Sequence, residues 1–408
     1  MEHTSTRLSA WRFVIGFGVV AMCADIVYEG ARSVTGPFLA HLGASALVVG
    51  VVTGVGESAA LLLRLVSGPL AGRSGRFWTW TLAGYAITVV SVPLLGVTAV
   101  LPVAVALVIA ERVGKAVRSP AKDTLLSHAT AVTGRGRGFA VHEALDQFGA
   151  LVGPLLVAGA LAWSGGDYRP AFLVLAVPGA VTIALAAALR ARVPDPAAYE
   201  LAAPAPAQAP EPAQAQGPSV HMEPRPVASR LPRAFWAYAS FVALTAAGFA
   251  TFGVISFHLV DAHLVATAAV PVIYAGAMVT DALAAVATGW GYDRWGSGVL
   301  VALPVVAAVV PALAFSGTVA VAVAGALVWG CVLGIQESTL RARVADLVPA
   351  GRRATAYGVF GAVVGVAAVA GGALAGGLYE VSVPMLVAVT VVLQAAALVL
   401  LLATLRRV

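Results

Sequence analysis

Long apolar blocks constrain the fold of this chain more than any other feature. Each runs for about 20 residues, the length an α-helix needs to cross a hydrocarbon core about 30 Å thick. Hydrophobic residues make up 60% of the 408-residue chain and charged residues 11%, whereas soluble domains are roughly half apolar and a quarter charged. The sequence therefore predicts an all-α polytopic membrane protein. Its twelve expected spans cover residues 12–36, 46–71, 78–97, 98–117, 138–163, 170–190, 234–260, 266–289, 297–316, 318–340, 354–378 and 382–404.

One span carries a pattern that occurs again in the second half of the chain. Glu143 to Leu161 reads EALDQFGALVGPLLVAGAL, and Phe360 to Gly376 reads FGAVVGVAAVAGGALAG. Both copies contain F-G-A-x-V-G followed by V-A-G. Small residues at four-residue spacing let a second helix approach closely, and an acid in a membrane helix is rarely kept unless it faces a cavity or a partner. A duplicated, glycine-rich span that opens with acids indicates a transporter.

A polar stretch divides the spans six and six. Residues 193–232 are rich in Pro, Ala and Gln and lack a periodic apolar face, so we expect an extended, mostly disordered linker on the cytoplasmic side. From Asp195 to Pro224 we expect no buried apolar face at all. The domains expected are an N-terminal six-helix bundle over 1–192 and a C-terminal six-helix bundle over 233–408.

The basic residues predict the orientation in the membrane. Lys and Arg accumulate in cytoplasmic loops, and placing the N-terminus inside puts nearly all of them on the inner face, with Arg169 as the exception. We therefore expect a multi-pass protein of the plasma (inner) membrane with both termini cytoplasmic. The net charge of +6 is explained by this topology, and no nucleic-acid partner is needed.

Several ionisable residues fall inside the expected spans. Asp25, Glu29 and Arg32 lie at i, i+4 and i+7, on one face of the first span. The full set of candidates for a proton-coupling site or substrate cavity is Asp25, Glu29, Arg32, Glu57, Arg64, Arg112, Glu143, Asp146, Asp281 and Glu337. Either these groups are structural salt bridges between helices, or at least one acid titrates during transport as an Arg neighbour comes and goes. Glu29, Glu57 and Asp146 are the first choices for the second role.

A basic stripe follows the fourth span. Glu111, Lys115, Arg118 and Lys122 lie at i, i+4, i+7 and i+11. For this stripe we favour an interfacial anchor that snorkels to lipid headgroups over a substrate gate.

Two six-span halves joined by a long cytoplasmic loop resemble the major facilitator superfamily. The loop GPLAGRSGRFW after the second span resembles the family signature G-x-L-a-D-R-x-G-R-[KR], and GWGYDRWG repeats it after the eighth. The resemblance implies two pseudo-symmetric bundles, alternating access, and a latch that braces the cytoplasmic helix ends. The latch residues would be Gly68, Arg73, Gly75, Gly289, Asp293 and Arg294. The first copy departs from the family because Gly72 replaces its acid, while the second keeps Asp293.

The fifth span carries a second marker. Gly149, Gly153 and Pro154 resemble the family's antiporter signature G-x-x-x-G-P-x-x-G-G, with Ala158-Gly159 in place of the final glycine pair. In the family this motif is associated with exporters that exchange substrate for protons. Close helix packing is an equally good explanation of the same glycines.

These features favour a secondary active transporter, most simply a proton-coupled antiporter that exports a small organic molecule. The acids of the first two spans favour a drug-like or cationic substrate over an anion. Alternatives are an importer or a divalent-cation exporter of the same fold, and a non-transporting receptor. The chain has no P-loop and no catalytic constellation, so we expect no enzyme activity, no cofactor and no resident metal. The expected partners are membrane lipid, the substrate and protons, and we expect a monomer.

Overall fold

The structure of this protein is a computed structural model that describes residues 8–201, 231–349 and 352–405. Helices and short connections account for all of these residues. Those of the N-terminal part are α1 (Ala10–His41), α2 (Ala46–Leu62), α3 (Arg64–Ser74), α4 (Phe77–Leu95), α5 (Leu101–Thr133), α6 (Arg135–Trp163), α7 (Tyr168–Leu173), α8 (Ala176–Arg192) and α9 (Ala197–Leu201). Those of the C-terminal part are α10 (Arg233–Ala247), α11 (Phe252–Asp261), α12 (Ala269–Trp295), η1 (Gly296–Val301), α13 (Ala302–Ala314), α14 (Val319–Leu347), α15 (Arg353–Val381) and α16 (Val383–Leu405).

The helices agree with the expected number of spans. By length and apolar composition alone, 10 stretches of the described chain could cross a membrane. One of them, Ala269–Ala314, contains two helices, because Gly296 has a positive φ of 63° and turns the chain between α12 and α13. The charged helix α5 adds the twelfth. The prediction of an all-α polytopic fold is confirmed, and the expected fourth span was too short because α5 continues to Thr133.

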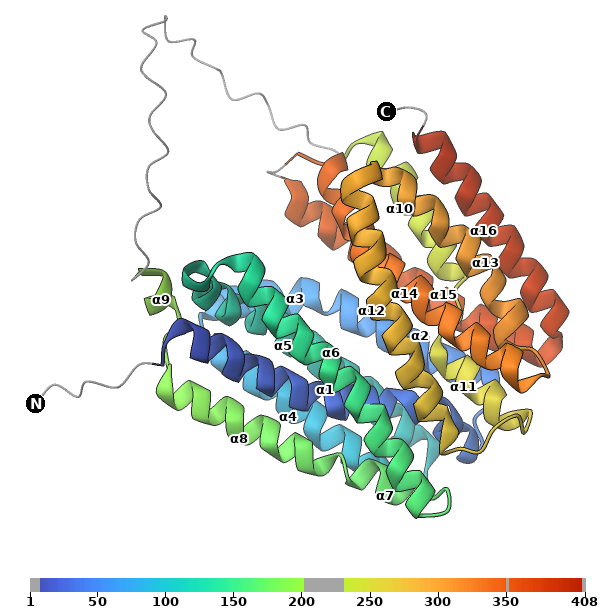
Figure 1. Cartoon of the computed structure of the whole chain (residues 1–408), viewed down its shortest axis with the longest axis horizontal. Coiled ribbons are helices and arrows are strands. Elements are labelled where there is room, and N and C mark those ends of the chain that lie inside the picture. Colours follow the sequence, from blue (N-terminus) through green and yellow to red (C-terminus); the bar gives the residue numbers. More distant parts are fainter. Residues whose placement is uncertain (1–7, 202–230, 350–351, 406–408) are drawn as a thin grey trace, which may run out of the picture.

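The helices form two bundles that diverge toward one end of the molecule (Figure 1). We call this the terminal end, because α1 and α10 begin there and α8 and α16 end there. The opposite, distal end holds the connections between α1 and α2 and between α11 and α12. We call α1 to α9 the N half and α10 to α16 the C half.

The two halves pack differently inside. Buried apolar side chains of the C half form one continuous cluster that runs from Phe235 to Leu401. Those of the N half form two, one around Phe38 and Phe172 toward the distal end and one around Phe13 and Trp78 toward the terminal end. Along α5 the stretch between these clusters includes the charged residues from Glu111 to Lys122, so a layer of ions divides the N-half core.

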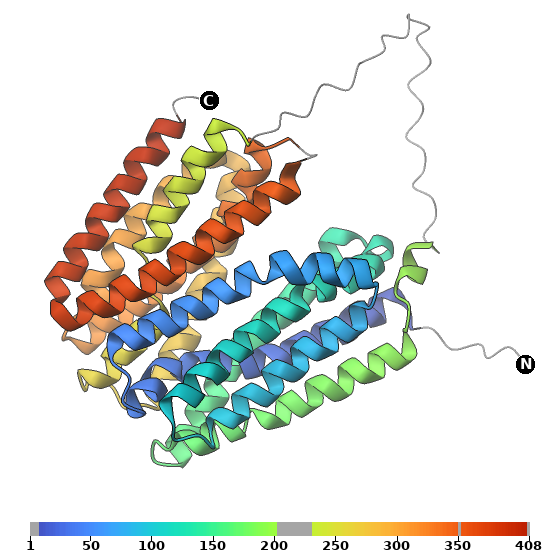
Figure 2. The same cartoon turned by 180° about the vertical axis from the view of Figure 1, so that it is seen from behind.

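The halves meet at the distal end through glycine. A Cβ added at Gly50 of α2 would lie 2.0 Å from the carbonyl oxygen of Gly372 in α15, and one added at Gly376 would lie 2.2 Å from that of Ala46. Gly36 of α1 faces Gly253 of α11 in the same way, at 2.1 Å. Figure 2 shows α2 and α15 side by side. Any side chain at these glycines would collide with the backbone of the other half. Glycine therefore lets the distal ends of the two halves lie in direct contact.

One carboxylate adds to this distal contact. Glu380 near the end of α15 accepts a hydrogen bond from the backbone N–H of Leu47, at 2.8 Å, in the first turn of α2. A carboxylate at a helix N-terminus satisfies a free N–H and interacts favourably with the helix dipole. The C half therefore caps a helix of the N half.

The expectation for the start of the linker was wrong. Residues Ala197–Leu201 form α9, and the Tyr199 hydroxyl donates to the Leu8 carbonyl oxygen at 2.6 Å. The Tyr199 ring also packs against Phe13, with centroids 5.7 Å apart. An aromatic side chain thus anchors the chain to the N half in a stretch where we expected no buried apolar face. The rest of the expected linker, 202–230, lies outside the described residues.

Candidate cavity between the two halves

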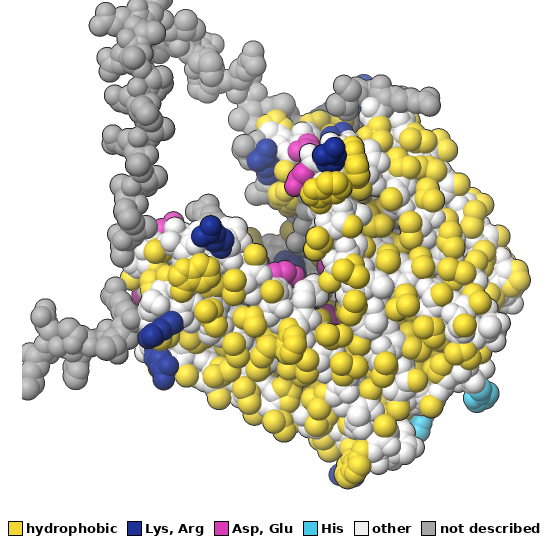
Figure 3. Space-filling view, in the orientation of Figure 1, with side chains coloured by type: hydrophobic (Ala, Val, Ile, Leu, Met, Phe, Trp, Pro, Cys, Tyr) yellow, Lys and Arg dark blue, Asp and Glu magenta, His cyan; other side chains and the backbone are white. Residues whose placement is uncertain are grey.

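A cavity of about 710 Å³ lies between the halves. The cavity opens between the halves toward the terminal end, as Figure 3 shows. Basic side chains lie at the helix ends around this opening. Its floor is formed by the glycine contacts of the distal end, since Gly253 and Thr53 line it. There the Thr53 and Thr251 hydroxyls are hydrogen-bonded across the halves at 2.8 Å. The cavity is therefore closed at the distal end.

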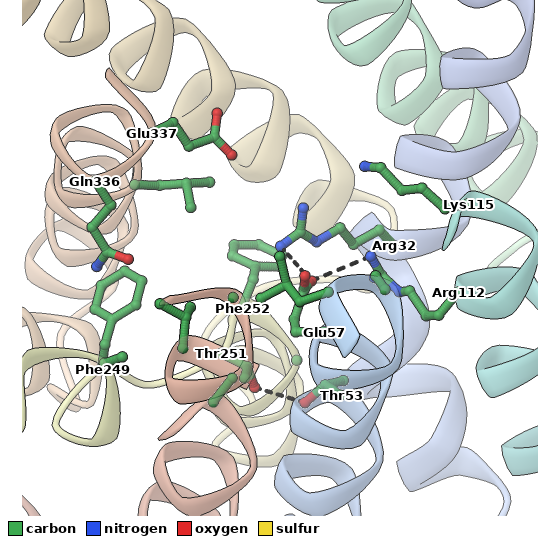
Figure 4. A pocket seen from close by; sticks show the side chains of 18 of the residues that line it. Arg32, Thr53, Glu57, Arg112, Lys115, Phe249, Thr251, Phe252, Gln336 and Glu337 are labelled. Atoms are coloured by element: carbon green, nitrogen blue, oxygen red, sulfur yellow. Dashed lines mark hydrogen bonds and ion pairs between the residues drawn. The ribbon is translucent and has the colours of Figure 1, made fainter. Parts of the chain in front are cut away.

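The centre of the N-half wall is the Glu57 carboxylate. Its Oε1 lies 3.0 Å from Nη2 of Arg32 on α1 and 3.2 Å from Nη1 of Arg112 on α5 (Figure 4). One acid on α2 thus joins three helices of the N half. The Glu57 side chain keeps 32% of its surface exposed, whereas that of Arg112 keeps 6%. Glu57 is therefore the most exposed member of the cluster, which also lines the cavity through Arg32 and Arg112.

Two further acids lie behind this pair. Arg112 Nε is 3.3 Å from Oε2 of Glu111, and its guanidinium also donates to the Tyr28 hydroxyl. Arg32 lies 3.7 Å from Glu29, and the Tyr274 hydroxyl of α12 donates to the other oxygen of Glu29. The Tyr274 bond crosses between the halves, so Glu29 is held by one cation of the N half and one hydroxyl of the C half.

Lys115 is one turn from Arg112 and extends into the cavity from α5 (Figure 4). Its ammonium lies over the Tyr28 ring, 3.7 Å from the centroid. Among the described residues, no carboxylate lies within salt-bridge distance of Lys115. It is a cation held by a π-face and open to the cavity.

The C-half wall is largely apolar and includes several aromatic side chains. Its helix pair α10 and α11 is broken between Ala247 and Phe252, and the unwound turn is held by Trp329, whose indole N–H donates to the Ala250 carbonyl oxygen at 2.8 Å. The Trp329 ring stacks on Phe249, with centroids 5.8 Å apart. Irregular backbone at this depth is tolerated because it borders a cavity. Gln336 and Glu337 of α14 add polar groups to this wall (Figure 4).

The cavity gathers some of the residues expected from the sequence. Arg32, Glu57, Arg64, Arg112 and Glu337 line it, and Glu29 lies directly behind Arg32. The other expected residues are not among its lining. Asp25 forms an ion pair with Arg118 at 3.9 Å, and Asp146 forms one with Lys122 at 3.7 Å. Glu143 is exposed. Asp281 is buried in α12, and its Oδ1 has no hydrogen-bond partner among the described residues.

The basic stripe of α5 does not form an interfacial anchor, and that interpretation was wrong. Arg118 is only 4% exposed; it donates to Thr88 at 3.1 Å and lies over the Tyr85 ring. From Arg118 onward the stripe faces the interior of the N half, where acids on α1 and α6 pair with it. Lys115 and the aromatic residues of the C half were not among the expected site residues. The i, i+4 spacing of Glu111 and Lys115 was the available signal for the lysine.

The expected latch residues lie on separate halves at the terminal end. Gly75 ends α3 with φ at 62°, and Gly68 packs on Pro120. Gly289 lies in α12, where an added Cβ would meet nothing within 4 Å, and Arg294 lies 5.8 Å from the centre of the Trp290 ring. Within the described chain neither Arg73 nor Asp293 forms an ion pair.

The glycines of the antiporter-like motif bring α6 against α1. An added Cβ would lie 2.4 Å from the Met22 carbonyl oxygen at Gly149, and 2.4 Å from the Ile26 carbonyl oxygen at Gly153. Pro154 continues the helix one residue further on. These glycines therefore have a packing role within the N half, whatever else they do.

A helical membrane protein with a cavity between two six-span halves, open at one end, has the architecture of a transporter. The family model of the Major Facilitator Superfamily matches residues 17–372. The chain belongs to this superfamily, as the sequence motifs suggested, and it is a transporter rather than an enzyme.

Relatives and solved structures agree with this assignment. An uncharacterized protein of Mycobacterium tuberculosis is 59% identical over 400 residues, covering 98% of this chain and 94% of that protein. An uncharacterized MFS-type transporter of Methanocaldococcus jannaschii is 24% identical over 182 residues, 45% of each chain. The nucleoside transporter NupG matches with a TM-score of 0.70 at 13% identity, covering 97% of this chain and 98% of that one. A peptide transporter POT in complex with sulfate matches with a TM-score of 0.73 at 14% identity, covering 97% and 94%. These likenesses to solved structures concern the fold.

Proposed function

We propose that this protein is a proton-coupled secondary active transporter of the plasma membrane that moves a small organic molecule by alternating access. The terminal end would face the cytoplasm, since Lys and Arg gather there, so the structure corresponds to an inward-open state. The observation that carries the proposal is the shared cluster of Glu57, Arg32 and Arg112 in a cavity that is closed at only one end.

Arg32 gives the cluster a means of coupling. It lies between Glu57 at 3.0 Å and Glu29 at 3.7 Å, and Glu29 is also bonded to Tyr274 of the other half. When the halves rock, the Tyr274 contact must change, and Arg32 can then move toward one acid and leave the other. A carboxylate that loses its cation in a site of low dielectric takes up a proton more readily. Binding and release of a proton would thereby follow the movement of the halves.

Export in exchange for protons is the direction we propose, with the protein acting as a monomer. The support is the antiporter-like motif of α6, which packs against α1, the helix that carries Glu29 and Arg32. Import through the same cavity is the alternative, and it differs in the sign of the substrate gradient that a proton gradient produces.

The experiment uses spin labels, because it needs no known substrate. One pair, at Val132 of α5 and Trp295 of α12, reports the terminal end; a second pair, at Val100 and Val381, reports the distal end. Cys23 and Cys331 are the two cysteines and would first be replaced by alanine. Raising the proton concentration should lengthen distances at one end and shorten them at the other.

Glu57→Gln should abolish this response, with Asp195→Asn, outside the cavity, as the matched control. A receptor that does not transport would keep both distances fixed at every pH. A response that persists in Glu57→Gln would remove Glu57 from the coupling mechanism. In proteoliposomes with a proton gradient, the sign of substrate accumulation separates export from import.

A further inference from the structure

We propose that the cavity binds an organic anion with an aromatic or apolar body, and that Lys115 is the residue that receives its negative group. This inference rests on the proposed transport function and names its substrate class. The acids counted in the sequence pointed to a cation. The structure changes that balance, because most of those acids have cations beside them before any substrate arrives.

The acids of the N-half wall are already engaged. Glu57 has two guanidiniums within 3.2 Å, Glu111 has Arg112 at 3.3 Å, and Glu29 has Arg32 at 3.7 Å. A cationic substrate would have to compete with these arginines for the carboxylates. It would also have to approach their positive charges in a partly desolvated site, where repulsion is strong. The N-half wall is thus poorly suited to a cation.

The same wall offers a cation that forms no ion pair with any described carboxylate. Four basic residues line the cavity (Arg32, Arg64, Arg112 and Lys115), against two acidic ones (Glu57 and Glu337). Of these, Lys115 is half-buried, has no carboxylate partner among the described residues, and extends from α5 into the open space. Its position over the Tyr28 ring fixes the ammonium without neutralising it. An ammonium held in this way can bind a carboxylate or a phosphate oxygen.

The opposite wall suits an apolar body. Phe249, Phe252 and Trp329 border the cavity together, and the Phe252 and Trp329 rings lie 5.4 Å apart. Aromatic faces gain both from apolar burial and from ring stacking. Glu337 is on this C-half wall and not beside Lys115 (Figure 4). An anion would therefore bind in one orientation, with its charge at α5 and its body against α10, α11 and α14.

The size of the cavity fits one such molecule. Its volume of about 710 Å³ lies within the range of roughly 300–1,000 Å³ in which small organic ligands bind. A bare inorganic anion would leave the aromatic wall without a partner. The cavity therefore favours an amphipathic organic acid over phosphate or sulfate alone.

The test uses three probes that share one body and differ in charge: 4-phenylbutyrate, 4-phenylbutanamide and 4-phenylbutylamine. Calorimetric titration of the purified protein should show the acid binding at least about tenfold more tightly than the amide, since a charged hydrogen bond is worth that much or more. The amine should bind more weakly than the amide. Inorganic phosphate, titrated alone, should bind more weakly than the acid.

Lys115→Gln should weaken binding of the acid roughly 10- to 100-fold and leave the amide within about twofold. Lys115→Arg should restore most of the affinity, because it keeps the charge. The matched control is Lys122→Gln: Lys122 is two turns along α5, pairs with Asp146 and is not among the residues that line the cavity. This variant should bind all three probes as the wild type does. Thermal melting of each variant checks that it is folded, and the comparison of acid with amide in the wild type needs no variant.

Four outcomes would each overturn the assignment of an organic anion to Lys115. In the wild type these are equal binding of acid and amide, tighter binding of the amine, and no binding of any probe. The fourth is an unchanged affinity for the acid in Lys115→Gln. The spin-label distances decide the proposed function separately. If they respond to pH while the acid shows no preference, transport stands and the substrate class is wrong. If they do not respond, the proposed function itself falls.

Discussion

The two halves of this protein share a fold but hold different chemistry. In the described N half, six ion pairs of Arg or Lys with a carboxylate lie among α1, α2, α5 and α6, and these divide its apolar core into two clusters. In the described C half, Arg343 and Asp346 form an ion pair at 3.9 Å, and the apolar core is one continuous cluster. The N half carries the cluster of paired charges, and the C half supplies most of the aromatic surface opposite it.

The duplicated glycine motif shows the same divergence. In α6, Gly149 and Gly153 press against the backbone of α1 inside the N half. At the equivalent positions of α15, Gly361 has open space where a Cβ would be and lines the cavity, and Gly365 faces Ser58 of α2. Equal sequence patterns thus serve packing within a half in one copy and contact between the halves in the other.

The largest effect should come from removing a cation of the N half. Arg112→Met leaves Glu57 and Glu111 beside an apolar side chain, and breaking a buried ion pair costs about 3–5 kcal/mol. Arg343→Met, in the C half, removes an ion pair with a half-exposed Asp346 and should cost about 0–1 kcal/mol. Unfolding midpoints in detergent measure the loss of stability in both variants. Equal losses of stability would show that the difference in ion pairs between the halves does not affect how stable each half is.

The duplicated glycine motif predicts a smaller difference in stability between matched variants of the two halves. Gly153→Ala places a methyl group against the Ile26 carbonyl oxygen and the Gly30 amide, backbone atoms that cannot rotate away, and overpacking of this kind costs about 1–3 kcal/mol. Gly361→Ala is its matched control, since nothing lies within 4 Å of the added Cβ, and it should be close to neutral. A stable Gly153→Ala would mean that α6 can move away from α1 easily.

The two latch loops predict opposite shifts of the conformational equilibrium when their acids are changed. Asp293→Asn removes the acid that the C half keeps, and should favour the inward-open state. Gly72→Asp restores the acid that the N half lacks, and should favour the opposite state. A carboxylate at a helix terminus contributes roughly 0.3–2 kcal/mol, and 1.4 kcal/mol changes a conformational ratio tenfold. The spin-label pair at the terminal end measures the shift, and unchanged distances in both variants would rule out a latch in either half.

The smallest effect concerns the contact between the halves at the distal end. Glu380→Gln keeps the shape but removes the charge that caps α2 through Leu47, so we expect a loss of about 0.3–1 kcal/mol from the inward-open state. The distal spin-label pair should broaden slightly toward longer distances. Asp167→Asn, a distal change within the N half, serves as control. An effect as large as that of Gly153→Ala would show that Glu380 stabilises the distal contact by more than a helix cap accounts for.

The sequence by itself determined the helices, the division into two sets of six spans and the family. These depend on local properties: the length of an apolar block, the turn made by a glycine, and the spacing of a loop motif. It also predicted that Asp25, Glu29 and Arg32 share one face of the first span, because their spacing along the helix fixes that face, and it gave Glu57 as a separate candidate.

Only the tertiary structure decided what the charges do. Which arginine faces Glu57 depends on how α1, α2 and α5 cross, and helical periodicity gives the face of one helix without naming its neighbour. In the structure the basic residues of α5 pair with acids of the N half and do not anchor the helix to lipid. Lys115 is open to the cavity, and the aromatic side chains of the C half lie opposite it. Electrostatic interactions depend on distance and on surrounding dielectric, and both are set by the packing of helices that are far apart in the chain.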